Sequence, residues 1–190
     1  MVKGIVRKIL LMVGCLLCLH ASWLPAKAWL SQQLISYSWH QSMQLNEEIK
    51  PWPWADTFPI AELLFKRVNK RVVVLNGGDP TTLAFSAGAV APFNQPLAPQ
   101  PFVVAGHRDS HFSFLKELKM EDIISLTDQY GQNQLYQIES IEIVDASAGQ
   151  LPISANDQQL ILLTCYPFDT RSIVNGSRSK QRYVITARLL

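Results

Sequence analysis

Acidic residues are absent from the first 46 positions of this 190-residue chain, and charged residues make up only 17% of the whole. Hydrophobic residues account for 48%, and that much apolar surface can offset the entropy lost on folding, which excludes a disordered chain. Beyond residue 46, 13 basic residues stand against 15 acidic ones. The folded part therefore lacks the basic surface that nucleic-acid binding requires, and we expect one domain without a nucleic-acid partner.

Cysteine is scarce, and its three positions divide between two environments. Cys15 and Cys18 lie inside an apolar run, where two membrane-buried thiols are a better interpretation than a zinc site. Cys165 is the remaining cysteine, so the exported domain offers it no disulfide partner. In an oxidising compartment such a thiol must be buried or used in chemistry. Carboxylates are not clustered as in a calcium site, and we expect no metal and no cofactor.

The N-terminus carries a membrane-directed pattern, in which three basic residues precede an apolar run of 16 residues, Ile9 to Leu24. As a helix this run would span about 24 Å, against roughly 30 Å of bilayer hydrocarbon, which is typical of a signal peptide. Residues 26–28 resemble a cleavage site, and Pro25 is expected to break a helix there. If the Lys27 ammonium reaches the interface, however, the apolar stretch continues to Leu30 and can cross the membrane.

We favour an uncleaved anchor over a cleaved signal or a buried core helix, because an apolar helical pattern continues beyond residue 30. The expected divisions are residues 1–30 as anchor or signal-like segment, 31–58 as helix and connector, and 59–190 as the main domain. Residues 31–49 predict a helix, and the connector Pro51-Trp52-Pro53-Trp54 ends it, with both Trp rings packed against the domain.

Short β-branched or aromatic runs separated by turn residues follow the connector. They are Val72–Leu75, Leu83–Phe85, Phe102–Ala105, Ile123–Thr127, Leu135–Val144, Leu160–Thr164 and Tyr183–Leu189, with the clearest turns at 76–80, 131–133 and 175–177. Seven or eight strands at this spacing, with one short helix near Phe114–Leu118 and a surface loop at Pro92–Pro101, predict an all-β fold, a closed or nearly closed β-barrel.

Three polar residues stand at the ends of predicted strands. His107 follows Gly106, which allows the sharp turn that would aim an imidazole into a cleft, although a surface turn histidine is the alternative. Cys165 ends an apolar strand, where a thiol is well placed to attack. Arg182 opens the last strand on its outer face, because period-2 alternation puts Tyr183, Ile185, Ala187 and Leu189 inside; a solvated arginine is the alternative. Together they make a cysteine-nucleophile site chemically coherent.

These segments resemble those of the sortase family. The run Leu162-Leu163-Thr164-Cys165 resembles the T-L-x-T-C signature, and Ala105-Gly106-His107 and Arg182-Tyr183-Val184 resemble the histidine and arginine segments, in the same order. The chain is most similar to the proteobacterial class GN sortases, on the basis of residues 51–57, 106–112 and 164–169. The resemblance implies an eight-stranded closed barrel with short helices, preceded by an N-terminal membrane helix.

By the same resemblance, Cys165 is the nucleophile, His107 the acid and base, and Arg182 the residue that stabilises the oxyanion or orients the substrate. Thr164 and Asp109 are the expected substrate-binding residues; Asp109 could also orient His107, although capping of the turn is the better interpretation. Two departures stand out. Ile161 replaces the first Thr of the signature, and Arg178 lies close enough in sequence to rival Arg182, which we favour.

The implied activity is that of a membrane-anchored cysteine transpeptidase. It would cleave a C-terminal Leu-Pro-x-Thr-Gly-like sorting signal of an exported protein through a thioacyl-enzyme and pass the acyl group to an amine acceptor. The expected location is the inner membrane, with a single span and the domain in the periplasm. The alternatives are a non-enzymatic envelope β-domain that binds a partner through Trp52 and Trp54, and another type of cysteine peptidase.

Overall fold

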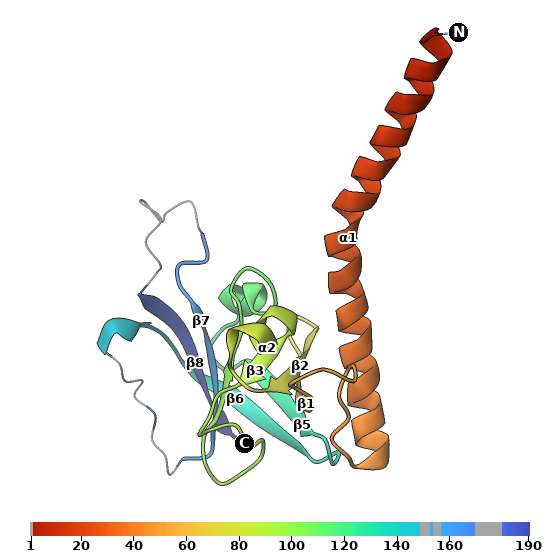
Figure 1. The fold of residues 1–190 in the computed structure, drawn as a ribbon. Coiled ribbons are helices and arrows are strands. Elements are labelled where there is room, and N and C mark those ends of the chain that lie inside the picture. Colours follow the sequence, from red (N-terminus) through yellow and green to blue (C-terminus); the bar gives the residue numbers. More distant parts are fainter. Residues whose placement is uncertain (1, 149–152, 154–156, 170–179) are drawn as a thin grey trace.

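The computed structural model describes residues 2–148, 153, 157–169 and 180–190, and eight strands in this part of the chain close into a barrel (Figure 1). The strands are β1 (Pro59–Phe65), β2 (Lys70–Asn76), β3 (Ala87–Ala89), β4 (Phe102–Ala105), β5 (Ile123–Asp128), β6 (Asn133–Asp145), β7 (Gln159–Cys165) and β8 (Gln181–Leu189). Their order around the barrel is β1-β2-β3-β4-β7-β8-β6-β5. The predicted all-β barrel of eight strands is thus confirmed.

Alternation along the strands separates an interior core from an outer apolar layer. In β7, Leu160 and Leu162 pack into the main core, whereas Ile161 lies on the opposite face with Val103 and Val184. Each fully buried aliphatic or aromatic side chain stabilises the fold by roughly 1.5–3 kcal/mol. The interior is therefore packed rather than open, and it holds the strand ends that carry the candidate site in place.

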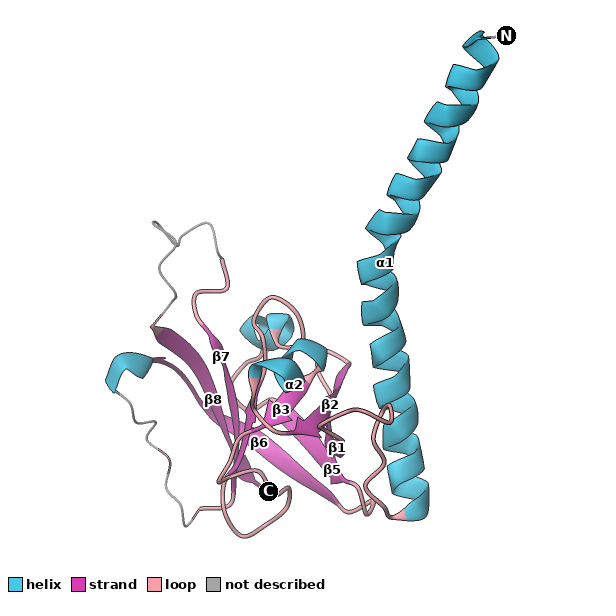
Figure 2. Ribbon diagram, viewed as in Figure 1, coloured by secondary structure: helices cyan, strands magenta, loops and turns pink. Residues whose placement is uncertain are grey.

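A single helix, α1 (Val2–Leu45), precedes the barrel and passes through Pro25 without a break. The expectation of a helix break at Pro25 was wrong, and so was the expected end near residue 49. Residues Gly4–Leu45 are long and apolar enough, by length and composition, to cross a membrane. The C-terminal part of α1 lies beside β1 and β2 (Figure 2) and buries one face, formed by Ser31, Ile35, Ser38, Trp39 and Ser42.

Three further short helices lie between the strands: α2 (Pro80–Phe85), η1 (Ser113–Glu117) and η2 (Ala146–Ala148). The segment Leu83–Phe85, predicted as a strand, is the end of α2, because the Asp79 carboxylate accepts bonds from the backbone N–H groups of Thr81 and Thr82 and starts a helix there. The helix near Phe114 is confirmed as the 3-10 helix η1.

Sequence reasoning missed two strands. It did not identify β1, whose start follows directly on the connector, or β3, which has three small residues and no apolar pattern. Trp52 packs edge-on against Phe85 with 4.9 Å between ring centroids, as expected, but Trp54 is 78% exposed, contrary to expectation. The turn predicted at 175–177 lies outside the described residues.

Candidate active site

The parallel pairing of β4 with β7 brings the histidine and cysteine segments to the same end of the barrel. Ala105 pairs with Leu163 in this ladder, and the chain continues two residues from each partner, to His107 and to Cys165. Because the two strands run in the same direction, both residues lie at the same end of the barrel. His107 is exposed and Cys165 half-buried, so both are accessible to a substrate.

The antiparallel pairing of β7 with β8 adds the arginine. Cys165 is the direct register partner of Arg182, and directly opposed residues project from the same face of a sheet, with their Cβ atoms about 4.5–5.5 Å apart. Leu162 and Ile185 also oppose one another, and both belong to the interior core. Because side chains alternate between the two faces of a strand, Cys165 and Arg182, each three residues away from this pair, lie on the outer face. Arg182 is half-buried, and its Nη1 donates to the carbonyl of Gln181 at 3.0 Å.

Thr164 joins the two parallel strands just below the site. Its side chain is 2% exposed, and its hydroxyl donates to the Gly106 carbonyl at 2.7 Å. The Gly106 N–H in turn donates to the Leu163 carbonyl at 3.1 Å, so both backbone groups before His107 are bound to the strand that carries Cys165. Thr164 thus ties the peptide before His107 to β7 through a buried bond, and its expected contact with the substrate stays a prediction.

The glycine before His107 is required by packing. A Cβ built on Gly106 would lie 2.7 Å from Cδ2 of Phe112, whose ring is fully buried. The loop after His107 folds back so that Phe112 N–H donates to the His107 carbonyl at 3.0 Å. Gly106 was expected to allow a sharp turn. In the structure, a glycine is needed at this position because the Phe112 ring packs directly against its Cα.

Arg108 is a residue of the site that sequence reasoning did not single out. Its side chain is 13% exposed, and its Nη1 donates to the carbonyl of Pro167, two residues beyond Cys165, at 2.6 Å. Its Nε lies 3.3 Å from the carboxylate of Asp109, which is 66% exposed. Arg108 thus links the histidine loop to the segment after the cysteine. Asp109 therefore forms an ion pair with Arg108. The expectations that Asp109 binds the substrate or orients His107 stay predictions.

An apolar strip on the outer face leads to the thiol. Ile161, Leu163 and Cys165 alternate along the outer face of β7, and Val184 lies opposite Leu163 in β8. Val103 completes the buried part of this strip, and half-buried apolar side chains pack around it, among them Val90, Phe93, Val144, Ile153 and Leu163. Ile161, Val103 and Val184 are already covered, at 2%, 3% and 8% exposed, whereas Leu163 and Cys165 are half-buried. The continuous apolar run before Cys165, buried on both faces, was the sequence signal for it.

An aromatic cluster supports the segment after Cys165. Tyr183 stacks on Tyr166 with 6.3 Å between ring centroids, and Phe168 meets Tyr183 edge-on at 5.0 Å. Burial raises the pKa of the Tyr183 phenol, and Tyr166 adds to the shift. Tyr183 packs on the interior core as predicted, so the cluster fixes the start of β8 next to Arg182.

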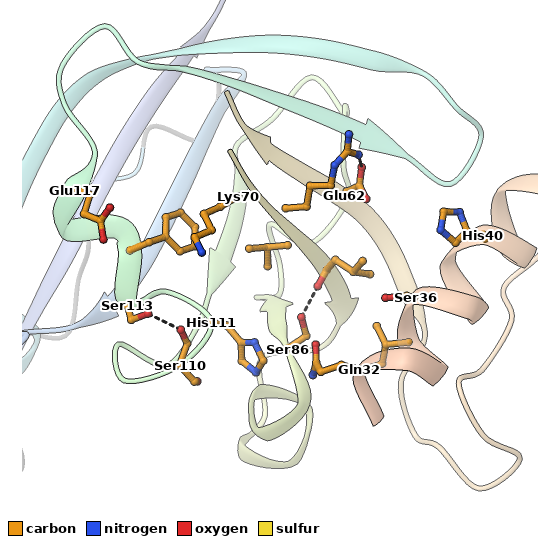
Figure 3. A pocket seen from close by; sticks show the side chains of 15 residues that line it. Gln32, Ser36, His40, Glu62, Lys70, Ser86, Ser110, His111, Ser113 and Glu117 are labelled. Atoms are coloured by element: carbon orange, nitrogen blue, oxygen red, sulfur yellow. Dashed lines mark hydrogen bonds and ion pairs between the residues drawn. The ribbon is translucent and has the colours of Figure 1, made fainter. Parts of the chain in front are cut away.

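His111 belongs to a separate cleft of about 630 Å³ between α1 and the barrel, shown in Figure 3. Gln32 and His40 of α1 line it together with Ser110 and His111 of the histidine loop. Burial lowers the pKa of His111, the nearby His107 lowers it further, and the Ala84 backbone partly opposes the shift. His40 and His111 line this cleft, and His111 lies near His107 in the histidine loop. In the described part of the chain, no three His, Cys, Asp or Glu side chains gather as a metal site.

A closed barrel that brings a cysteine, a histidine and an arginine together at or just beyond the ends of three neighbouring strands is the framework of a cysteine-nucleophile enzyme. The family pattern described as the sortase domain matches residues 65–190, and the chain belongs to the sortase family. Among curated proteins, Sortase D of Bacillus subtilis is 29% identical over 119 residues, which cover 59% of this chain and 60% of the relative's length.

Solved structures show the same fold. Sortase A from Corynebacterium diphtheriae has a TM-score of 0.59 at 23% identity, covering 72% of this chain and 63% of that one. A Clostridium perfringens structure described as a Sortase D5 transpeptidase has a TM-score of 0.60 at 20% identity, covering 83% of this chain and 92% of that one.

Proposed function

We propose that this chain is a membrane-anchored cysteine transpeptidase. The single observation that carries the proposal is the strand register, which aligns Cys165 with Arg182 and leads β4 to His107 at the same barrel edge. The substrate is an exported protein with a C-terminal Leu-Pro-x-Thr-Gly-like signal, and the acceptor is an amine. The anchor is residues 1–30, in the inner membrane, and the domain of residues 59–190 faces the periplasm. We assign the enzyme to the class GN group of sortases.

The first half-reaction forms the thioacyl-enzyme. The Cys165 thiolate attacks the carbonyl of the scissile peptide bond, and the carbonyl π electrons move onto oxygen to give a tetrahedral oxyanion. The Arg182 guanidinium donates hydrogen bonds to that oxyanion or to the neighbouring substrate carbonyl. When the C–N bond breaks, the His107 imidazolium gives its proton to the leaving amine, and the carbonyl re-forms as a thioester.

The second half-reaction reverses these steps with a new amine. Neutral His107 takes a proton from the acceptor amine as its nitrogen attacks the thioester carbon. Collapse of the second tetrahedral intermediate breaks the C–S bond, releases the transferred product and restores the thiolate and imidazolium pair. The half-buried side chain of Leu163, two residues before Cys165 on the same face of β7, supports this proposal, since it can contact an apolar residue of the signal beside the thiol.

The test uses a soluble fluorogenic peptide that contains a Leu-Pro-x-Thr-Gly signal, with an added amine acceptor. The wild-type chain should cleave the peptide and form an acyl-enzyme, seen as an increase in the mass of the enzyme that corresponds to the acyl fragment. Cys165→Ala should do neither, while keeping the same far-ultraviolet circular dichroism. Retained cleavage by the alanine variant would refute the mechanism. A Cys165 thiol that iodoacetamide labels no faster than free cysteine, together with no cleavage, would favour a non-enzymatic envelope domain.

A further inference from the structure

The backbone pairing between β4 and β7 ends just before the two reactive residues. In the described part of the chain, its last backbone bond runs from the Gly106 N–H to the Leu163 carbonyl at 3.1 Å. His107 lies one residue beyond Gly106, and Cys165 lies two residues beyond Leu163. Both residues therefore stand past the point at which backbone pairing fixes the distance between the two strands.

Arg108 connects the two segments again, on the far side of His107 and Cys165. Its Nη1 donates to the Pro167 carbonyl at 2.6 Å, and its side chain is only 13% exposed. Proline has no N–H with which to continue a strand pairing, but its carbonyl is still an acceptor. The histidine and the cysteine therefore lie between the end of the β4–β7 pairing and the Arg108–Pro167 bond.

The segment that accepts this bond is held on its other side by β8. The Tyr166 N–H donates to the Gln181 carbonyl at 3.1 Å, and the Phe168 ring meets Tyr183 edge-on with 5.0 Å between ring centroids. Pro167 lies between these two attached residues, so its carbonyl is fixed relative to the start of β8. The bond from Arg108 thus joins the histidine loop to a point that is already anchored in the barrel.

A second partner orients the Arg108 guanidinium. Its Nε lies 3.3 Å from a carboxylate oxygen of Asp109, while Nη1 donates to the Pro167 carbonyl. These two nitrogens belong to one rigid plane, whereas a lysine offers a single flexible point charge. Because Nη1 is bonded to a backbone carbonyl and the side chain is largely buried, Arg108 acts on the backbone of the site and not on the substrate.

We propose that Arg108 is a positioning residue, which sets the distance between the His107 imidazole and the Cys165 thiol by closing the histidine loop onto the segment after the cysteine. The His107 side chain is exposed, so its place depends on the backbone that carries it. The step that depends on this place is proton donation to the leaving amine, and a misplacement of 1 Å can cost about 10²-fold in rate. The proposal rests on the transpeptidase function proposed above.

The experiment compares two substrates that differ in their need for this proton. One is the soluble signal peptide, and the other ends in a thiophenyl thioester at the carbonyl of the scissile bond. When the Cys165 thiolate attacks the thioester, a new C–S bond forms, the bond to the leaving sulfur breaks, and thiophenolate departs without a proton. Rapid-quench mass spectrometry of the full-length chain in detergent follows formation of the same acyl-enzyme from both substrates.

Arg108→Met removes both donors and keeps a long unbranched side chain. Acylation by the peptide should slow by about 10²-fold, with kcat and kcat/KM falling together and KM within about threefold of wild type. Acylation by the thioester should stay within about fivefold of wild type, because its leaving group takes no proton. Arg108→Lys keeps one donor without the rigid plane, so acylation by the peptide should slow by only about 10-fold.

Arg67→Met is the matched control, since Arg67 makes the same two kinds of contact elsewhere in the barrel. Its Nε donates to the Asp122 carboxylate at 2.6 Å, and its Nη2 donates to the Glu117 carbonyl. Arg67 follows β1, which lies opposite β7 in the strand order of the barrel. Both methionine variants should lower Tm, whereas Arg67→Met should be acylated by both substrates within about threefold of the wild-type rate.

Equal slowing of Arg108→Met with the peptide and the thioester would overturn the positioning role, because a general disturbance of the site affects both reactions. Wild-type rates in this variant would overturn it too. If Arg108→Met does not fold, Arg108→Lys decides, and the proposal fails if lysine slows the peptide by less than about twofold or slows both substrates alike. A wild-type chain that does not cleave the peptide would instead refute the proposed function, and this proposal with it.

Discussion

Thr164→Val isolates the contribution of one buried hydrogen bond to the geometry of the site. Valine has nearly the same shape as threonine, so the change removes the donor to the Gly106 carbonyl without opening a large cavity. Because Thr164 is 2% exposed, water has little access to replace the bond, and an unsatisfied buried carbonyl costs about 1–3 kcal/mol of unfolding free energy. In a domain of this size each kcal/mol lowers Tm by about 2–4 °C.

The same change should lower activity, because the Gly106 peptide directly precedes His107. Loss of its bond from β7 frees the histidine segment to shift relative to Cys165, and a misplacement of 1 Å can cost about 10²-fold in rate. We expect kcat/KM for the soluble signal peptide to fall by about 10-fold to 10²-fold.

Thr164→Ser is the matched control, since it keeps the hydroxyl and loses a methyl group. It should cost about 1 kcal/mol and leave kcat/KM within a few-fold of wild type. Thermal unfolding of the full-length chain in detergent and steady-state kinetics check both variants. If the valine variant keeps wild-type Tm and kcat/KM, or if serine is the more damaging change, the assigned role of Thr164 is wrong.

Two further predictions concern the arginine of the site and pH. Arg182→Lys should lower the rate of acylation by roughly 10²-fold, because a lysine cannot reproduce the two parallel donors of a guanidinium, and rapid-quench mass spectrometry measures it. Arg188→Lys, an exposed change six residues along the same strand, should have little effect, and equal losses in both would contradict the role of Arg182. Burial lowers the pKa of His111 below its ordinary 6.5, so below about that pH the unfolded chain binds a proton that the folded chain does not. Stability should therefore fall as the pH drops through this range, and denaturant titrations should find that His111→Asn weakens the fall.

Local sequence pattern was enough to predict a closed or nearly closed barrel and to single out three candidate residues, whose roles came from the resemblance to sortases. The strands β4, β7 and β8 have strong apolar or alternating patterns, and their ends are where Gly106, Cys165 and Arg182 stand. The strand β3 could not be found this way, because its three small residues carry no periodicity; pairing with β2 and β4 and burial of Ala87 and Ala89 in the core define it. The segment Leu83–Phe85 was misassigned because its β-branched and aromatic neighbours outweighed the helix cap at Asp79.

What remained undecided before the fold was known is how residues distant in sequence meet. Cys165 and Arg182 become opposed through β7 and β8 pairing, and Arg108 reaches Pro167 across 59 positions. The burial of Thr164 likewise depends on the neighbouring chain, because its hydroxyl donates to the carbonyl of Gly106, which follows β4. Short-range preferences set the type and ends of each strand, because they act within a few residues. Register and convergence depend on contacts made only when the barrel closes, and these contacts place the thiol, the imidazole and the guanidinium at one edge.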